Sequence, residues 1–201
     1  MNKEELGIIT GYGKFYKCKI NPSWEAAKTF KDKVIKENGK TVRLDVEYFD
    51  VDYNIVGDGV KEKIYDKNPS FILHIGLNNS LNNTLNFETS AYYTKEFDNC
   101  KLNNGNCCEI LETDLKWIND LRSNTNKILS NDGWNCNLSN DPGRYLCNYI
   151  YYLSLHYKKE NNKDFKVFFL HIPNVNNTPQ RTQQCINEAI SIIIHEIVKL
   201  I

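Results

Sequence analysis

Polar and apolar residues alternate along some short stretches of the chain, and apolar residues recur every three or four positions along others. In residues 41–49, Val42, Leu44 and Val46 share one face and charged side chains share the other, which is the period-two pattern of a half-buried strand. In residues 115–129, apolar side chains recur at helical spacing and predict an amphipathic helix. Sheet and helix are therefore expected together.

The same two patterns assign most of the remaining chain. Further strands are expected at residues 6–10, 71–75, 84–88, 134–138 and 167–172, and further helices at residues 24–35, 53–65 and 182–200 and around Cys147. Strands alternate with helices nearly throughout, which is typical of an α/β layer fold. We expect a single domain over residues 1–201, built as a three-layer α/β/α sandwich with a mainly parallel, mixed central sheet.

Composition and charge narrow the function classes. The 201 residues are 41% apolar and 25% charged, which suits one globular domain with a sizeable core. The formal net charge is zero. No nucleic-acid partner is expected, because a surface that binds nucleic acid needs an excess of basic residues. No secretory signal is evident, and the longest apolar run, Ile190–Ile194, is too short to cross a membrane.

The cysteines indicate a reducing compartment. There are seven, an odd number, in a chain without an evident export signal, so free thiols and a cytoplasmic location are expected. Cys100 and the adjacent pair Cys107 and Cys108 lack the Cys-x-x-Cys spacing that lets two sulfurs hold one ion. Neither a metal nor another cofactor is expected.

The stretch 139–152 carries the first candidate for chemistry. Asp141 and Pro142 suit the cap and first position of a helix, and Gly143 permits a tight backbone path. Cys147 would then lie early in that helix, where the positive end of the helix dipole favours the nucleophilic thiolate. The alternative is that Cys147 is a buried and inert cysteine, since free cysteine is among the most buried residue types.

A partner for this thiol is expected at the carboxyl end of a strand. Ligands of α/β folds bind beyond these ends, here in the loops 11–21, 76–91 and 139–147 and after His171. His171 ends an apolar strand and faces these loops, whereas His74, His156 and His195 suit the core or a helix. Glu88 ends another expected strand and is a candidate to orient an imidazole. From spacing alone, this Glu–Cys–His assignment stays open.

Four segments resemble the pyroglutamyl-peptidase I family of cysteine peptidases, in the family's order. Segment 139–148, Ser-x-Asp-x-Gly-Arg-Tyr-Leu-Cys-Asn, resembles its catalytic-cysteine motif. Residues 10–24, with Thr-Gly-Tyr, then Phe15 and Asn-Pro-Ser-Trp, resemble its substrate loop. Residues 85–91 resemble its catalytic-glutamate segment, and Phe-Leu-His-Ile-Pro at 169–173 resembles its catalytic-histidine strand. The details around the cysteines look closer to the animal-type enzymes.

The resemblance implies a cytosolic exopeptidase, an omega peptidase that removes an N-terminal pyroglutamyl residue from peptides. It implies that Cys147 is the nucleophile and forms a thioester, that His171 is the general base and then acid, and that Glu88 orients His171. Backbone N–H groups at the start of the Cys147 helix would bind the oxyanion. The residues that it implies for the lactam pocket are Tyr12 and Phe15, which stack on the ring, Asn21, which bonds it, and Tyr145 and Leu146.

This sequence departs from the family pattern at several of these positions. Tyr12 stands where the family has phenylalanine, Pro142 where it has alanine, and the segment around Glu88 is divergent. A second hypothesis therefore remains, a weakly active or non-catalytic relative that binds pyroglutamyl peptide ends. A glutamine amidotransferase-like hydrolase is disfavoured, because its nucleophile lies on a sharp elbow between glycines that this chain lacks. The sequence leaves the choice between monomer and homo-oligomer open.

Overall fold

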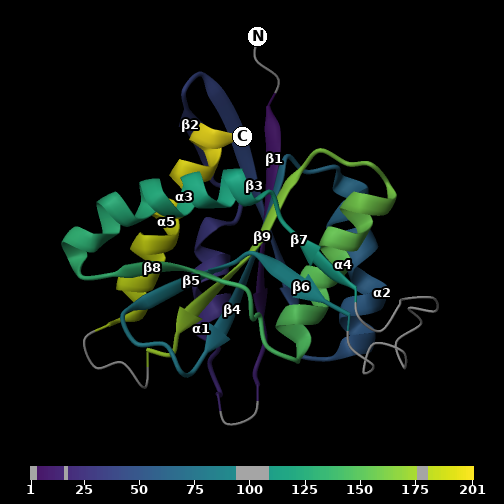
Figure 1. Ribbon diagram of the computed structural model, residues 1–201, viewed down its shortest axis with the longest axis horizontal. Helices are drawn as coiled ribbons and strands as arrows, with labels where there is room; N and C mark the ends of the chain where they lie inside the picture. The colour runs from purple at the N-terminus through teal and green to yellow at the C-terminus, as the bar shows by residue number, and fades with distance from the viewer. Residues whose placement is uncertain (1–3, 16–17, 94–108, 176–180) are drawn as a thin grey trace.

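The computed structural model describes residues 4–15, 18–93, 109–175 and 181–201, and its centre is one seven-stranded sheet (Figure 1). The strand order is β2-β3-β1-β4-β9-β5-β8. The strands are β1 (Glu5–Tyr12), β2 (Val34–Glu37), β3 (Lys40–Phe49), β4 (Phe71–Asn78), β5 (Thr84–Glu88), β8 (Asn135–Ser139) and β9 (Lys166–Pro173). A separate pair of short antiparallel strands consists of β6 (Ser90–Tyr92) and β7 (Ile110–Glu112).

The described helices cover both faces of the sheet, as Figure 1 shows. Helices α1, α3 and α5 pack on one face, and α2 and α4 pack on the other. Their bounds are α1 (Pro22–Ala27), α2 (Tyr53–Lys63), α3 (Leu115–Leu129), α4 (Leu146–Glu160) and α5 (Gln183–Leu200), and short 3₁₀ turns occupy Lys28–Phe30, Tyr65–Lys67 and Ser130–Asp132. The expected three-layer α/β/α sandwich is therefore confirmed.

The sheet is mixed and mainly parallel, as the sequence predicts. Four neighbouring strands, β3, β1, β4 and β9, run in one direction. Strands β5 and β8 are parallel to each other, but β5 is antiparallel to β9, and β2 is antiparallel to β3. Parallel strands of this kind need helical crossovers, which places helices on both faces and buries the sheet.

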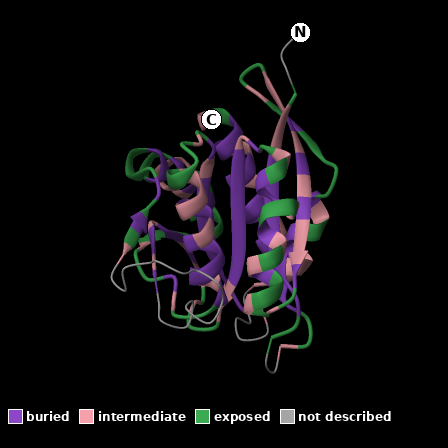
Figure 2. Ribbon diagram, turned by 90° about the vertical axis from the view of Figure 1, so that its right-hand side faces the viewer, coloured by how far each residue is buried: buried purple, intermediate pink, exposed green. Residues whose placement is uncertain are grey.

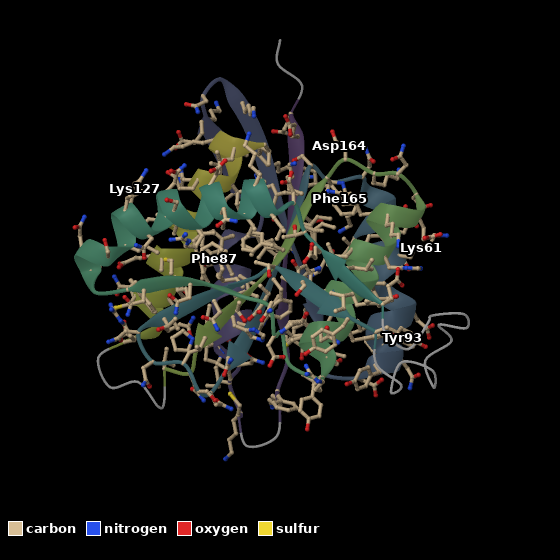
Figure 3. All side chains as sticks on the ribbon, viewed as in Figure 1. Lys61, Phe87, Tyr93, Lys127, Asp164 and Phe165 are labelled. Atoms are coloured by element: carbon tan, nitrogen blue, oxygen red, sulfur yellow. The ribbon has the colours of Figure 1, made fainter. Side chains whose placement is uncertain are left out.

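The burial of the central strands follows from these two helical layers. In β9, Phe168 and Leu170 join the core on the α1, α3 and α5 side, whereas Val167 and Phe169 join the core on the α2 and α4 side. Figure 2 shows buried central strands between helices whose outer sides are exposed. In Figure 3, side chains fill the space on both sides of the sheet. No helix in the described ranges has the length and apolar character to span a membrane.

The expected helix over residues 24–35 is wrong in its second half. Helix α1 ends at Ala27, and Val34 and Ile35 lie in β2, which pairs with β3 through a tight turn. Asn38 and Gly39 form this turn with φ values of 48° and 77°. An Asn-Gly pair between two strands is a strong hairpin signal, because both positions need positive φ. The β-branched pair before it agrees with a strand, so local chemistry favoured the hairpin over the helical pattern.

Candidate active site

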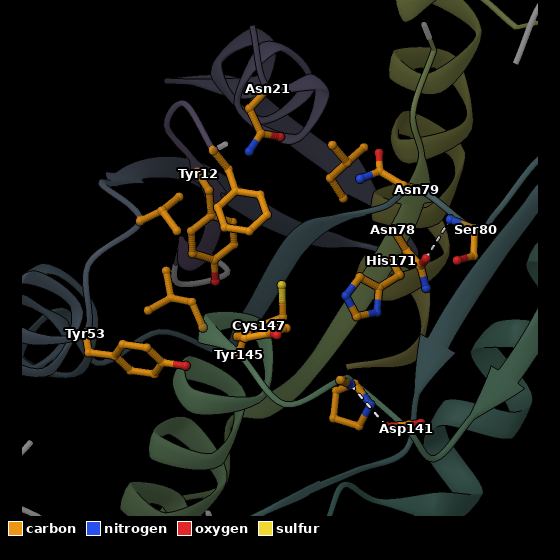
Figure 4. Close-up of a pocket in the computed structure, with 16 residues that line it drawn as sticks. Tyr12, Asn21, Tyr53, Asn78, Asn79, Ser80, Asp141, Tyr145, Cys147 and His171 are labelled. Atoms are coloured by element: carbon orange, nitrogen blue, oxygen red, sulfur yellow. Dashed lines mark hydrogen bonds between the residues drawn. The ribbon is translucent and has the colours of Figure 1, made fainter. Parts of the chain in front are cut away.

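A cavity of about 590 Å³ opens at the carboxyl ends of the parallel strands (Figure 4). This is the end at which the sequence places the site. The walls come from the β1 end and the loop after it, the β3–α2 connection, the residues after β4, the segment before α4, and β9. The lining residues are Tyr12, Phe15, Asn21, Val51, Tyr53, Leu77, Asn78, Asn79, Ser80, Asp141, Pro142, Gly143, Tyr145, Leu146, Cys147 and His171.

His171 and Glu88 form a buried pair beside this cavity. His171 Nδ1 lies 2.7 Å from Glu88 Oε1, and the two residues are 4% and 0% exposed. The pair depends on register, because Glu88 lies opposite Phe169 in the antiparallel β5–β9 ladder and is therefore a diagonal neighbour of His171 on the same face. A carboxylate only accepts hydrogen bonds, so Nδ1 carries the proton and Nε2 faces away from Glu88.

Cys147 is the second residue of α4, and its thiol lies beside His171 in Figure 4. Space for the thiol comes from Gly76, which pairs with His171 in the β4–β9 ladder. A Cβ at Gly76 would overlap the ring of Phe169 and would lie 3.0 Å from Cys147 Sγ. Glycine at this position therefore allows α4 to bring the thiol down onto the sheet.

The hydrogen bonds around His171 decide its charge. Burial lowers the pKa of His171, but hydrogen-bonding contact with Cys147 and Glu88 outweighs burial and raises it to about 9. At neutral pH the imidazole is therefore protonated, held between a carboxylate and the cysteine sulfur. This arrangement suits a thiolate–imidazolium pair, which is the activated form of a cysteine nucleophile.

The expected helix start at Asp141 and Pro142 is wrong, because α4 begins at Leu146 and the residue before it provides no side-chain cap. Asp141 instead closes a turn, in which its Oδ1 accepts from the backbone N–H of Gly143 at 3.2 Å. Gly143 has a φ of 84°, which interrupts any helix there. Asp and Pro favour turns as well as helix starts, so the same residues fit both interpretations.

Asn148 and Tyr92 hold this segment in place, and sequence reasoning assigned no role to either. Asn148 Oδ1 accepts from the backbone N–H of Tyr92 at 2.9 Å, and its Nδ2 donates to the carbonyl of Tyr92 at 2.7 Å. The Tyr92 hydroxyl lies 2.7 Å from both Asp141 Oδ1 and the Gly143 carbonyl oxygen. Asn148, the residue after Cys147, therefore connects α4 to β6, and Tyr92 of β6 holds the turn before α4.

All five residues implied for the lactam pocket line the cavity. Tyr12 and Leu146 are buried, whereas Phe15 is 47% exposed and Tyr145 is 72% exposed at the mouth. Asn21 caps α1, because its Oδ1 accepts from the backbone N–H of Ser23 at 3.1 Å, and its Nδ2 donates to the carbonyl of Gly13 at 2.9 Å. Asn21 therefore shapes the loop and keeps one amide hydrogen for a ligand.

One part of the wall was missed from the sequence, Val51 and Tyr53, which follow β3. The rule of strand carboxyl ends could have indicated it, because β3 is a parallel neighbour of β1. Their side chains carry no catalytic signature of their own, so only this topology singles them out. Residues 77–80, which belong to β4 and the turn after it, also line the cavity, and they lie in or beside the loop 76–91 that the sequence indicates.

The other described histidines lie outside the cavity lining. His74 is fully buried between Thr10 and Ser154, and burial lowers its pKa to about 3, so it stays neutral. His195 pairs with Glu37 at 2.8 Å on the outer surface. The candidate metal cysteines Cys100, Cys107 and Cys108 lie outside the described residues, and the expected absence of a metal stays a prediction.

Comparison with known proteins gives matches over nearly the whole chain. The family model for pyroglutamyl peptidase matches residues 120–201. Pyrrolidone-carboxylate peptidase of Brachyspira hyodysenteriae is 27% identical over 93% of this chain and 96% of that protein. Human pyroglutamyl-peptidase 1 is 25% identical over 96% of this chain and 90% of its own length. Pyrrolidone carboxyl peptidase of Pyrococcus furiosus has a similar fold, with a TM-score of 0.76 at 20% identity, covering 98% of this chain and 100% of that one.

The fold is of the α/β class and is similar to that of pyrrolidone carboxyl peptidases. The chain is similar in sequence to pyroglutamyl peptidases over nearly its whole length, and the family model matches its C-terminal part. Bacterial and animal relatives match at similar identity, so the expected closeness to the animal-type enzymes stays a prediction.

Proposed function

We propose that this protein is a cysteine exopeptidase that hydrolyses the N-terminal pyroglutamyl residue from peptides, with Cys147, His171 and Glu88 as its triad. The observation that carries the proposal is the buried His171–Glu88 pair at 2.7 Å, whose histidine lines the same cavity as Cys147. Three residues from α4, β9 and β5 converge there. Their order, nucleophile, base and orienting carboxylate, is the arrangement that nucleophilic catalysis requires.

The reaction proceeds in two steps. Cys147 Sγ attacks the carbonyl carbon after the pyroglutamyl ring, and the backbone N–H groups of the first turn of α4 bind the developing oxyanion. These groups lack intrahelical partners, and no side chain caps this helix. His171 gives its proton to the leaving amine, which departs as the shortened peptide. Water, activated by His171, then hydrolyses the thioester and releases pyroglutamate.

The cavity wall suits the proposed substrate. A pyroglutamyl ring is small, flat and uncharged, and it carries one N–H and one C=O. Aromatic and aliphatic side chains, including Tyr12, Phe15 and Leu146, form much of the wall, and a few polar groups lie among them. Small-molecule sites commonly combine apolar walls with a few polar contacts in this way.

The raised pKa of His171 predicts a broad activity range on the alkaline side. Because the pKa is raised from 6.5 to about 9, the imidazolium that protonates the leaving amine persists up to about pH 9 and is lost above it. A profile of kcat/KM against pH should therefore stay high through pH 8 and fall above about pH 9. An alkaline fall centred near pH 7 would contradict this assignment.

The test of the proposed function is hydrolysis of a chromogenic pyroglutamyl amide, with the matching prolyl amide as the control substrate. The pyroglutamyl amide should be cleaved and the prolyl amide should not, because proline lacks the lactam carbonyl. Iodoacetamide should abolish activity in step with alkylation of Cys147, followed by peptide mass spectrometry. Binding of pyroglutamyl peptides without turnover, or alkylation of Cys147 no faster than that of Cys18 and Cys185, would reject the proposal.

We also propose that the enzyme acts in the cytosol. The described cysteines, Cys18, Cys136, Cys147 and Cys185, are all free thiols. Free thiols persist in reducing compartments such as the cytosol.

A further inference from the structure

The side chain of Tyr12 carries a buried hydroxyl group without a hydrogen-bond partner among the described residues. Tyr12 is the last residue of β1, is 3% exposed and lines the cavity that contains Cys147. A buried hydroxyl is normally paired, because leaving it unpaired is unfavourable. A hydroxyl that the described residues leave unpaired in the wall of a binding cavity is available to a group that enters the cavity.

The surrounding structure holds the Tyr12 ring in one place. The backbone N–H of Tyr12 donates to Ser23 Oγ at 3.1 Å, and the ring stacks on Phe169 with centroids 6.4 Å apart and planes 21° apart. The resemblance of residues 10–24 to the family's substrate loop implies phenylalanine at this position, so this chain adds a hydroxyl there. The aromatic ring at this position is thus kept, and a polar oxygen atom is added at the end of the ring.

The polar groups nearest to Tyr12 are already engaged. Thr10, two residues earlier on the same strand, lies close enough to act on the phenol, but its Oγ1 lies 2.8 Å from His74 Nδ1. His74 Nε2 in turn lies 3.0 Å from Ser154 Oγ, and Ser154 Oγ lies 3.1 Å from the Tyr65 hydroxyl. These residues form a continuous buried network. The Tyr12 hydroxyl is near Thr10 but makes no hydrogen bond of full geometry to it.

The Tyr12 phenol remains a hydrogen-bond donor at any working pH. Burial, reinforced by the charge of a Cys147 thiolate, raises the pKa of Tyr12 well above its usual value, and the contact with Thr10 reduces this only in part. The hydroxyl also makes no hydrogen bond to Cys147 itself. Figure 4 shows it directed into the cavity on the side of Cys147 that is opposite to His171.

We propose that Tyr12 Oη donates a hydrogen bond to the lactam carbonyl oxygen of the bound pyroglutamyl residue and thereby helps to distinguish pyroglutamate from proline. This inference rests on the proposed function and adds one specificity-determining contact to it. With the scissile carbonyl at Cys147 Sγ, the lactam ring occupies the adjoining space, and its carbonyl is an acceptor without a proton of its own. Proline has no such carbonyl, so its ring would leave the Tyr12 hydroxyl unpaired.

The decisive variant is Tyr12→Phe, which removes only the hydroxyl. Hydrolysis of the pyroglutamyl amide should show a KM about 3- to 10-fold higher with kcat nearly unchanged, the loss expected for one ground-state hydrogen bond. The prolyl amide should remain uncleaved in both proteins, so the change appears only with the pyroglutamyl amide. The melting temperature should stay level or rise, because an unpaired buried hydroxyl is removed.

The matched control is Tyr65→Phe, which removes a buried tyrosine hydroxyl outside the cavity lining. The Tyr65 hydroxyl is paired with Ser154, so its loss should lower the melting temperature and leave KM unchanged. A purely structural role of the Tyr12 hydroxyl would make Tyr12→Phe behave like this control. That outcome would overturn the inference.

A second measurement separates this inference from the proposed function, because it needs no turnover. 2-Pyrrolidone, the bare lactam, should slow alkylation of Cys147 by iodoacetamide, and Tyr12→Phe should require about 3- to 10-fold more of it for equal protection. If the wild type fails to hydrolyse pyroglutamyl amides but shows this Tyr12-dependent protection, the proposed function fails and the contact stands. Equal protection in both proteins overturns the contact. A shift in the pH dependence of alkylation without lactam would assign the hydroxyl to the thiolate instead and would also overturn it.

Discussion

The Cys147→Ser variant should lose pyroglutamyl amide hydrolysis by at least about a thousandfold, the scale on which removal of a nucleophile acts. The thiol is placed against an imidazole whose pKa of about 9 keeps it protonated at neutral pH. In a thiolate–imidazolium pair, the proton is on His171 before the substrate binds. A serine hydroxyl is far less acidic than a thiol and would retain its proton, so no nucleophile would form at rest.

The matched control is Cys185→Ser, the same exchange at a free, half-buried cysteine outside the cavity lining. Its kcat/KM should equal that of the wild type. The measurement is kcat/KM for both variants, with circular dichroism and melting temperature to show that each is folded. Residual activity of Cys147→Ser within tenfold of the wild type would mean that another group performs the attack.

The layer architecture could be predicted from the sequence because it depends on local periodicity. The helix over residues 115–129 has the expected bounds, and the strand at 84–88 also has them. Failures occurred where one residue type serves two local structures. Asp141 and Pro142 close a turn instead of starting α4, and the apolar spacing that suggested a helix through Ile35 continues into a hairpin.

The candidate site could be named from the sequence only in part, because its geometry depends on contacts between distant segments. The reversed direction of β5 brings Glu88 opposite Phe169 and within reach of His171, and no local pattern encodes that direction. In the sequence, Gly76 indicates only the end of a strand. In the structure, the absence of a Cβ at this residue makes room for the thiol of Cys147. The Asn148 contact with β6 likewise becomes visible only in the folded chain.

The Glu88→Gln variant should reduce kcat by about ten-thousandfold, the loss that the same carboxylate-to-amide exchange causes at the orienting carboxylate of a catalytic triad. Glu88 Oε1 accepts the Nδ1–H of His171 at 2.7 Å, which keeps Nε2 available for Cys147. Glutamine keeps the shape but removes the charge, and its amide nitrogen can occupy either oxygen position. The tautomer of His171 is then no longer fixed, and the imidazolium loses its counter-charge.

The pH profile distinguishes this role of Glu88 from general damage to the fold. Contact with Glu88 raises the pKa of His171, so in Glu88→Gln the pKa should fall below about 9 and the alkaline limb of kcat/KM should move to lower pH. The matched control is Glu37→Gln, which alters the His195–Glu37 pair, of similar length at 2.8 Å but on the outer surface. Its activity and pH profile should match those of the wild type. A Glu88→Gln enzyme that is slower but keeps its alkaline limb near pH 9 would show that Glu88 supports the fold without setting the charge of His171.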